Sequence, residues 1–340
     1  MIDTKRVTVS AEQPDSEVVT EAAGILDRGG LVAFPTETVY GLAADAFNDS
    51  AIHKVFDAKG RPSDNPLIVH IAETSSLSTI SASFPEIGLT LARTFWPGPL
   101  TMVVQRTDRI SDLVTAGLDT VAIRMPSHPV ALSLIRKLGR AIVAPSANIS
   151  GRPSPTTAEH VSDDLNGKID FILDAGATRI GVESTVLDIT QTPPIILRKG
   201  GLSKEAIEAV VGQIGSETDG KLLNRSPGNR YKHYSPRADI LLVREGDTVE
   251  YSRIIHDEVV CTKKIGCILH SIPDQTPGPN VVVRTISPDI ESISHMLFDL
   301  LREFDKAGVD VIIVEEVADK GLGMAVMDRL RRASVTSKIN

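Results

Sequence analysis

Short apolar segments that end in a polar or basic residue recur between residues 31 and 198 of this chain. Segments of this kind predict short strands buried within an α/β sheet. Open α/β sheets bind their ligands beyond the strand ends, so polar groups at those ends are candidate site residues. If the strands share one sheet, these groups converge on a cleft that carries positive charge. The residues concerned are Thr36, Lys59, Arg61, His70, Arg124, Ser146, Asn148, Ser184 and Arg198.

Residues 59–70, which read KGRPSDNPLIVH, show the pattern most fully. Pro62 disfavours the helical region for the residue before it, so we expect residues 59–61 to be extended. Alternate residues of an extended chain share a face, and this would bring Lys59 and Arg61 together. Two cations held on a stiff loop suit an anionic ligand. Taken alone, however, the tripeptide is more typical of a solvated basic turn.

Two other predicted strand ends carry hydroxyl and amide groups. Thr36 lies in the segment PTETVYGL, directly after a strand expected at 31–34, and its alternative role is to cap a helix. Ser146 and Asn148 follow a strand expected at 141–144. In an extended chain their spacing places both side chains on one side, where neutral donors and acceptors suit substrate positioning. An Asx or Ser turn is the alternative for this pair.

The bulk composition limits the class of protein. The 340 residues predict two domains, and 41% apolar with 24% charged residues is typical of a soluble globular protein. The net charge of −8 argues against a chain coated with nucleic-acid-binding charge. Cys261 and Cys267 have neither redox nor zinc spacing, so we expect two buried thiols in a reducing compartment. No segment resembles a signal peptide or approaches membrane-spanning length, which predicts a cytoplasmic protein with no membrane partner.

Several familiar catalytic motifs are missing from the sequence. It contains no GxxxxGK[ST] phosphate loop, no HExxH zinc motif and no GxSxG nucleophile elbow. The remaining candidates are the strand-end groups. These would act by positioning and electrostatics rather than through a covalent nucleophile.

The chain divides into three expected parts. Residues 1–212 hold the strand-end groups and form the first domain. Residues 213–237 are rich in small polar residues and predict an interdomain linker, whose end RYKHYSP carries the aromatic and basic groups of a segment that docks on the active site. The alternative is a linker that merely packs on a domain surface. In residues 238–340 the pattern predicts strands at 240–243, 265–269 and 281–283, then a helix, a strand at 311–314 and a last helix, which together indicate a smaller α/β domain.

Seven blocks in fixed order resemble the YrdC-like family: PTETVYGLAAD, KGRPSDNPLIVHI, WPGPLT, VAIRMP, APSANISG, ESTVLD and LRKG. The linker segment RYKHYSP and the ending GLGMAVMDRLRRA are similar to those of its long form, the L-threonylcarbamoyladenylate synthases with a C-terminal extension domain. The resemblance covers nearly the whole chain. It implies an α/β fold with a YrdC-like twisted mixed sheet flanked by helices, followed by a smaller Rossmann-like α/β domain.

The resemblance also implies a reaction and its site. L-threonine, bicarbonate and ATP would give L-threonylcarbamoyl-AMP and pyrophosphate, and the adenylate would feed threonylcarbamoyladenosine modification of tRNA position 37. The implied catalytic residues are Lys59, Arg61, Ser146 and Asn148. The implied threonine contacts are Thr36, His70, Arg124, Ser146 and Ser184. The implied ATP contacts are Arg61, Asn65, Thr115, Ala144, Ser154, Arg198 and Asn229, the last at a position where the family more often has Met.

The implied cofactor is Mg²⁺ carried on the ATP phosphates, with no ligand from the protein. The implied partners are the downstream tRNA threonylcarbamoyl-transfer machinery and, weakly, RNA. Two alternatives stay open. One is a double-stranded RNA-binding module without turnover, which would bind with a steep salt dependence. The other is a carbamoyl-transfer domain like that of hydrogenase maturation proteins, although their acylphosphatase and zinc-finger-like segments are absent.

Overall fold

The computed structural model describes residues 2–216, 234–256, 260, 262–271 and 278–334. The chain divides into two compact units, one of residues 1–150 with 154–231 and one of residues 151–153 with 232–340. Most of the expected linker, 213–237, lies outside the described residues. Its first part does not, because Gly215–Ser216 form the short strand β12 of the first unit's sheet.

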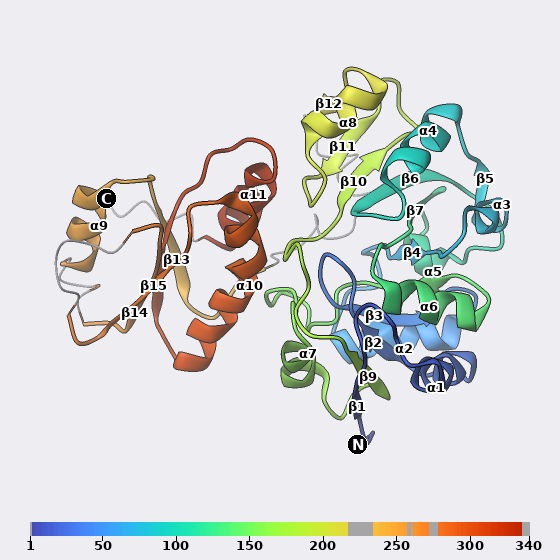
Figure 1. Cartoon of the computed structure of the whole chain (residues 1–340), viewed down its shortest axis with the longest axis horizontal. Coiled ribbons are helices and arrows are strands. Elements are labelled where there is room, and N and C mark those ends of the chain that lie inside the picture. Colours follow the sequence, from blue (N-terminus) through green and yellow to red (C-terminus); the bar gives the residue numbers. More distant parts are fainter. Residues whose placement is uncertain (1, 217–233, 257–259, 261, 272–277, 335–340) are drawn as a thin grey trace. The chain divides into compact units, whose positions relative to one another are not determined.

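The first unit is built on one 12-stranded mixed sheet (Figure 1). The sheet contains both parallel and antiparallel strand pairs, as expected for a twisted mixed sheet. In sheet order the strands are β1 (Lys5–Thr8), β9 (Phe171–Asp174), β2 (Val32–Phe34), β3 (Gly41–Asp45), β8 (Ile142–Val143), β4 (Ile68–His70), β7 (Thr120–Arg124), β6 (Leu100–Arg106), β10 (Thr185–Asp188), β11 (Ile195–Arg198) and β12, with β5 (Ser81–Ser83) beside β6.

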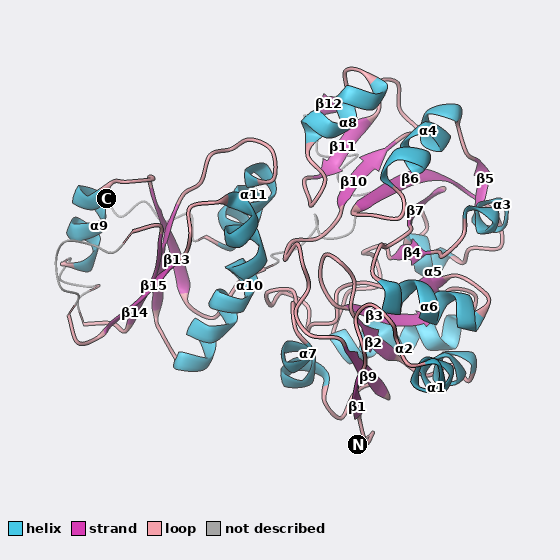
Figure 2. Cartoon of the chain, in the orientation of Figure 1, coloured by secondary structure: helices cyan, strands magenta, loops and turns pink. Residues whose placement is uncertain are grey.

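Helices cover both faces of this sheet (Figure 2). Successive strand residues point to opposite faces, so Val32 and Phe34 belong to one apolar cluster and Ala33 to another. This burial on both faces explains why the strands are short apolar runs rather than alternating ones. The helices are α1 (Ser16–Asp27), α2 (Asp49–Lys59), α3 (Leu77–Ile80), α4 (Glu86–Phe95), α5 (Asp112–Thr115), α6 (Pro129–Leu138), α7 (Ala158–Leu165) and α8 (Lys204–Val211), with a 3₁₀ turn at Thr74–Ser76.

The predicted extended conformation of residues 59–61 is wrong. Helix α2 continues through Lys59, and Gly60 ends it in the left-handed region with φ 58° and ψ 38°. A glycine adopts this conformation without steric cost and closes a helix, so Pro62 restricts only Arg61. Lys59 and Arg61 therefore do not share the face of an extended strand.

The second unit is a four-stranded parallel sheet, as the Rossmann-like prediction requires. Helix α9 (Thr248–Ile255) packs on one face, and α10 (Ile290–Ala307) packs on the other, where the ring of Phe304 lies against Gly266 (Figure 1). A Cβ at Gly266 would lie 2.9 Å from that ring. In sheet order the strands are β13 (Asp239–Val243), β16 (Val311–Glu315), β14 (Ile265–Leu269) and β15 (Val281–Thr285), and the helices are α9 (Thr248–Ile255), α10 (Ile290–Ala307) and α11 (Gly323–Ala333).

The described residues also bear on the expectations for the cysteines and for membrane-spanning segments. Cys267 is a buried free thiol, as predicted, whereas Cys261 lies outside the described residues. Burial raises the pKa of the Cys267 thiol to about 11. No described helix combines the length and the apolar character needed to span a membrane.

Candidate active site

The loop between β2 and β3 places Thr36 and Thr38 next to the end of β7. The Thr36 hydroxyl donates to the carbonyl of Val39 over 2.6 Å and accepts from its main-chain N–H over 3.2 Å. Since that hydroxyl hydrogen is used, Thr38 donates to Thr36 across the 2.8 Å between their Oγ1 atoms. Thr36 therefore organises a turn, and neither threonine caps a helix.

Arg124 ends β7 and meets this loop in a buried ion pair. Its Nη2 lies 2.8 Å from Oε1 of Glu37 and donates to Oγ1 of Thr38 over 2.9 Å. Nε donates to the carbonyl of Gly98 over 3.3 Å. The other Glu37 oxygen accepts from the main-chain N–H of Ser127 over 3.1 Å. The side chains of Arg124 and Glu37 are only 5% and 4% exposed, so the fixed positive charge sits beside a fixed negative one.

His70, at the end of β4, pairs in register with Arg124 on β7. Burial, and to a lesser degree the Arg124 charge, lowers the pKa of His70 to about 3, so the ring is neutral near pH 7. Nδ1 lies 3.2 Å from the Ile68 carbonyl, which can only accept. The proton is thus on Nδ1, and Nε2 is a hydrogen-bond acceptor.

Arg124 is joined to Ser184 and Arg198 through β6. Thr101 pairs with Arg124 across β6 and β7, and its hydroxyl lies 2.8 Å from that of Ser184. Arg198 donates to the Ser184 carbonyl from Nε over 3.1 Å and from Nη2 over 2.9 Å, and to the Ser184 hydroxyl over 3.1 Å. The structure thus places four predicted residues in two buried hydrogen-bonded groups on neighbouring strands, Thr36 with Arg124 and Ser184 with Arg198.

A second group forms around Lys59. Its Nζ donates to the carbonyls of Ser146 and Asn148, each over 2.5 Å. The Ser146 hydroxyl donates to Oδ1 of Asn148 over 2.6 Å, so the prediction that these two side chains lie on one side is confirmed. A β-bridge from Gly41 to Ser146 places this group beside the chain that follows Thr36 and Thr38.

The remaining predicted residues surround the start of β4. Arg61 folds back onto the carbonyls of Asn65 and Pro66, with a shortest contact of 2.9 Å. Ala144 donates its N–H to the Ile68 carbonyl over 3.0 Å. Thr115 is buried, and its hydroxyl has no hydrogen-bond partner among the described residues. The carbonyl of its neighbour Val114 accepts a hydrogen bond from the N–H of Leu67, the residue just before β4.

Two carboxylates also belong to these groups. Glu37 was expected at a strand end but was given no role, and Glu183 was missed. The Ser154 hydroxyl is hydrogen-bonded to Oε1 of Glu183, and both residues are buried. The usable signal was that each acid adjoins a predicted contact, Thr36 or Ser184, close to a buried strand, where an unpaired charge would be costly. Asn229 lies outside the described residues.

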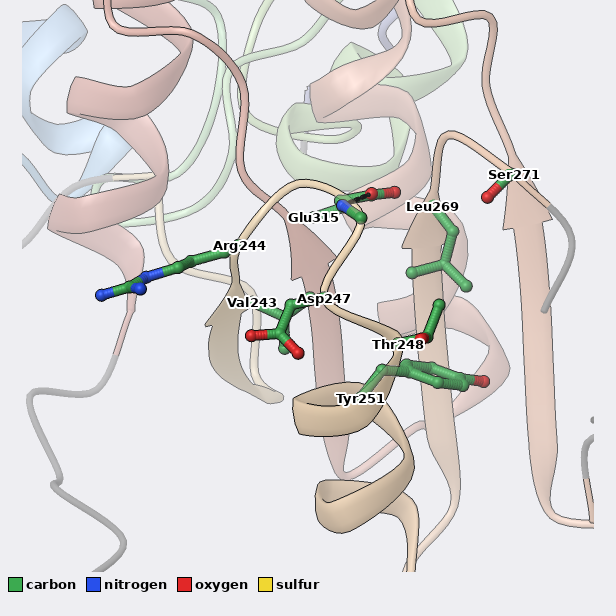
Figure 3. Close-up of a pocket in the computed structure, with 9 residues that line it drawn as sticks. Val243, Arg244, Asp247, Thr248, Tyr251, Leu269, Ser271 and Glu315 are labelled. Atoms are coloured by element: carbon green, nitrogen blue, oxygen red, sulfur yellow. Dashed lines mark hydrogen bonds between the residues drawn. The ribbon is translucent and has the colours of Figure 1, made fainter. Parts of the chain in front are cut away.

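A pocket of about 40 Å³ lies within the second unit (Figure 3). Leu269 and Glu315, at the carboxyl ends of β14 and β16, line it together with Tyr251 of α9, and none of the predicted site residues does. Glu315 accepts from the N–H groups of Gly246 and His270 over 2.6 and 2.7 Å, and so ties together the loops after β13 and β14. In the described parts of the chain, no group of three or more His, Cys, Asp or Glu could hold a metal ion.

The fold and these strand-end groups define an α/β protein of the YrdC-like class. The Sua5/YciO/YrdC family, described as "Telomere recombination", matches residues 24–200. The family "Threonylcarbamoyl-AMP synthase, C-terminal domain" matches residues 202–335. The chain therefore belongs to the two-domain threonylcarbamoyl-AMP synthase family, a family of adenylyl-transferring enzymes.

Two relatives and one solved structure show how far this similarity extends. The threonylcarbamoyl-AMP synthase of Pyrococcus abyssi is 48% identical over 92% of this chain and 93% of its own length. That of Bacillus subtilis is 46% identical over 93% of this chain and 92% of its own length. The crystal structure of P. abyssi Sua5 complexed with L-threonine has a TM-score of 0.89 and 45% identity, and the match covers 98% of this chain and 97% of that one.

Proposed function

We propose that this chain converts L-threonine, bicarbonate and ATP to L-threonylcarbamoyl-AMP and pyrophosphate, which supplies threonylcarbamoyladenosine modification of tRNA position 37. The observation that carries the proposal is 48% identity, over nearly the full length of both chains, to a threonylcarbamoyl-AMP synthase. We place the reaction in the cytoplasm. The adenylate would pass to the downstream tRNA threonylcarbamoyl-transfer machinery.

The proposed chemistry has two steps. The threonine amine, deprotonated, attacks the carbon of bicarbonate and forms a carbamate, with loss of water. A carbamate oxygen then attacks the α-phosphorus of ATP, and the bond to pyrophosphate breaks. The carbamate and ATP are both anionic, so fixed cations are needed to lower their repulsion. Lys59, Arg61 and Arg198 are the cations to which we assign this role.

Threonine recognition is assigned to the network around Arg124. A guanidinium is a natural partner for the substrate carboxylate. The neutral His70 ring offers Nε2 as an acceptor for the substrate hydroxyl. A buried acceptor of this kind discriminates strongly against analogues without the hydroxyl, because it would be left unpaired.

The ATP contacts are assigned to Arg61, Asn65, Thr115, Ala144, Ser154, Arg198 and Asn229. Mg²⁺ prefers phosphate oxygens and water to an all-protein cage, so we expect it to arrive on the nucleotide phosphates.

The test is product formation by the full chain. With threonine, bicarbonate and Mg-ATP present, we expect pyrophosphate release together with an adenylate whose mass is that of threonylcarbamoyl-AMP. Omission of threonine or bicarbonate should abolish both. L-2-Aminobutyrate, which lacks the hydroxyl, should react at least tenfold more slowly. Pyrophosphate release that does not depend on threonine would refute the proposal. An inactive chain that binds double-stranded RNA with steep salt dependence would favour the RNA-binding alternative.

A further inference from the structure

The guanidinium of Arg124 is held by protein on one side only. Nη2 contacts Glu37 and Thr38, and Nε contacts the carbonyl of Gly98. Nη1, by contrast, has no hydrogen-bond partner among the described residues. An arginine held in this way keeps two donors on a single nitrogen for a ligand, and their direction is fixed by the contacts on the other side.

Glu37 is itself fixed from several directions. Its Oε2 accepts from the N–H of Ser127, and its main-chain carbonyl accepts from Ile180 over 2.8 Å. Its Oε1 is fully buried and makes no hydrogen bond of good geometry, although it lies 2.8 Å from Nη2 of Arg124. The contact is therefore mainly one of charge. Because Oε1 is inaccessible, Glu37 acts through Arg124 and not on a substrate directly.

We infer that Glu37 is a positioning residue for the amino-acid substrate, because it holds Nη2 of Arg124 so that Nη1 is presented to the substrate carboxylate. This inference rests on the proposed function, which supplies threonine as the substrate. Without the Glu37 charge, a buried guanidinium would turn toward any other acceptor. Nη1 would then no longer be placed for the threonine carboxylate. Arg198 and Ser154, to which ATP contacts are assigned, would keep their positions.

The decisive variant is Glu37→Gln, which keeps the side-chain length and removes the charge. We expect the KM for threonine to rise at least tenfold and the KM for ATP to stay within twofold of wild type. Glu37→Asp keeps the charge on a shorter side chain, so its KM for threonine should lie between those of wild type and Glu37→Gln. Glu73→Gln is the control. It removes a surface ion pair between Glu73 and Arg136, whose side chains are 59% and 54% exposed respectively, and it should change neither KM value.

A merely structural role predicts a different outcome. In that case Glu37→Gln would raise both KM values, lower kcat and lower the melting temperature together, and this result would overturn the inference. So would a threonine KM within twofold of wild type. Calorimetric binding of threonine separates the inference from the proposed function. If the wild type binds threonine without forming adenylate, the proposed function fails, and a tenfold weaker affinity of Glu37→Gln still supports the inference. A wild type that neither binds threonine nor reacts overturns both.

Discussion

The Nζ of Lys59 lies 2.5 Å from the carbonyl oxygens of both Ser146 and Asn148, and the Lys59 residue is only 2% exposed. The last residue of α2 thus fixes the loop that carries two other predicted catalytic residues. A buried ammonium is stable only where acceptors surround it, and the two carbonyls supply them. Lys59 therefore contributes structure as well as charge to the site.

Lys59→Met should destabilise the first unit by about 2–4 kcal/mol, because two buried carbonyls lose their charged donor. Trp96 is the only tryptophan in the sequence and belongs to the first unit, so its fluorescence during urea unfolding reports this unit. Lys54→Met is a matched control on the same helix, since Lys54 donates to a single carbonyl, that of Gly29, over 2.7 Å. An equal loss of stability in both variants would contradict the role given to the Lys59 contacts.

Thr101→Val should destabilise the first unit by roughly 1 kcal/mol and raise the KM for threonine several-fold, because Ser184 loses a hydrogen bond inside the network that reaches Arg198. Thr120→Val is the control. Thr120 is also buried, but its hydroxyl has no hydrogen-bond partner among the described residues. Its removal should be neutral or stabilising. Steady-state kinetics measure the KM for threonine, and Trp96 fluorescence during urea unfolding measures stability. If Thr101→Val and Thr120→Val give the same values, the hydrogen bond from Thr101 to Ser184 does not have this role.

The pH dependence of stability should carry a contribution from His70. Its pKa is about 3 in the folded chain and about 6.5 when unfolded, so between these values the unfolded chain binds the extra proton. Stability is therefore full above pH 6.5 and falls as the pH drops towards 3, by up to about 1.4 kcal/mol per pH unit.

His70→Gln removes this contribution. Between pH 7 and pH 5 the wild type should lose roughly 2 kcal/mol more than the variant, as measured by urea unfolding at each pH. His53→Gln, at an exposed position, should behave as wild type. If wild type and His70→Gln lose stability in parallel, His70 is not held in its neutral form by the fold.

The strand ends could be predicted from the sequence because burial on both faces leaves a clear apolar run, as in β4 and β7. The uncharged pair Ser146 and Asn148 does lie on one side, joined by a hydrogen bond, although residues 147 and 148 form a bend and not the extended chain on which the prediction was based. The conformation of residues 59–61 was predicted wrongly, because the sequence does not show whether a helix ends before a glycine such as Gly60 or continues up to it. Helix α9 was missed because only Tyr251 and Ile254 of its eight residues are buried.

The ion pair between Glu37 and Arg124 could not be derived from spacing. The two residues are far apart in sequence and come from a loop and a strand whose contact depends on the sheet order. The same applies to Glu183 and Ser154. Long-range charge pairs of this kind follow from topology, whereas the sequence patterns used here report local structure.

The central claim is that fixed cations allow two anionic reactants to meet, and Arg61→Ala tests it most directly. We predict that threonine- and bicarbonate-dependent pyrophosphate release falls at least 100-fold, while the variant still unfolds in one cooperative Trp96 transition. The midpoint of that transition should be lower than in wild type, because the carbonyls of Asn65 and Pro66 lose their charged donor. Arg93→Ala, at a side chain that is 71% exposed, should retain full activity. Pyrophosphate release by Arg61→Ala within twofold of wild type would contradict the account.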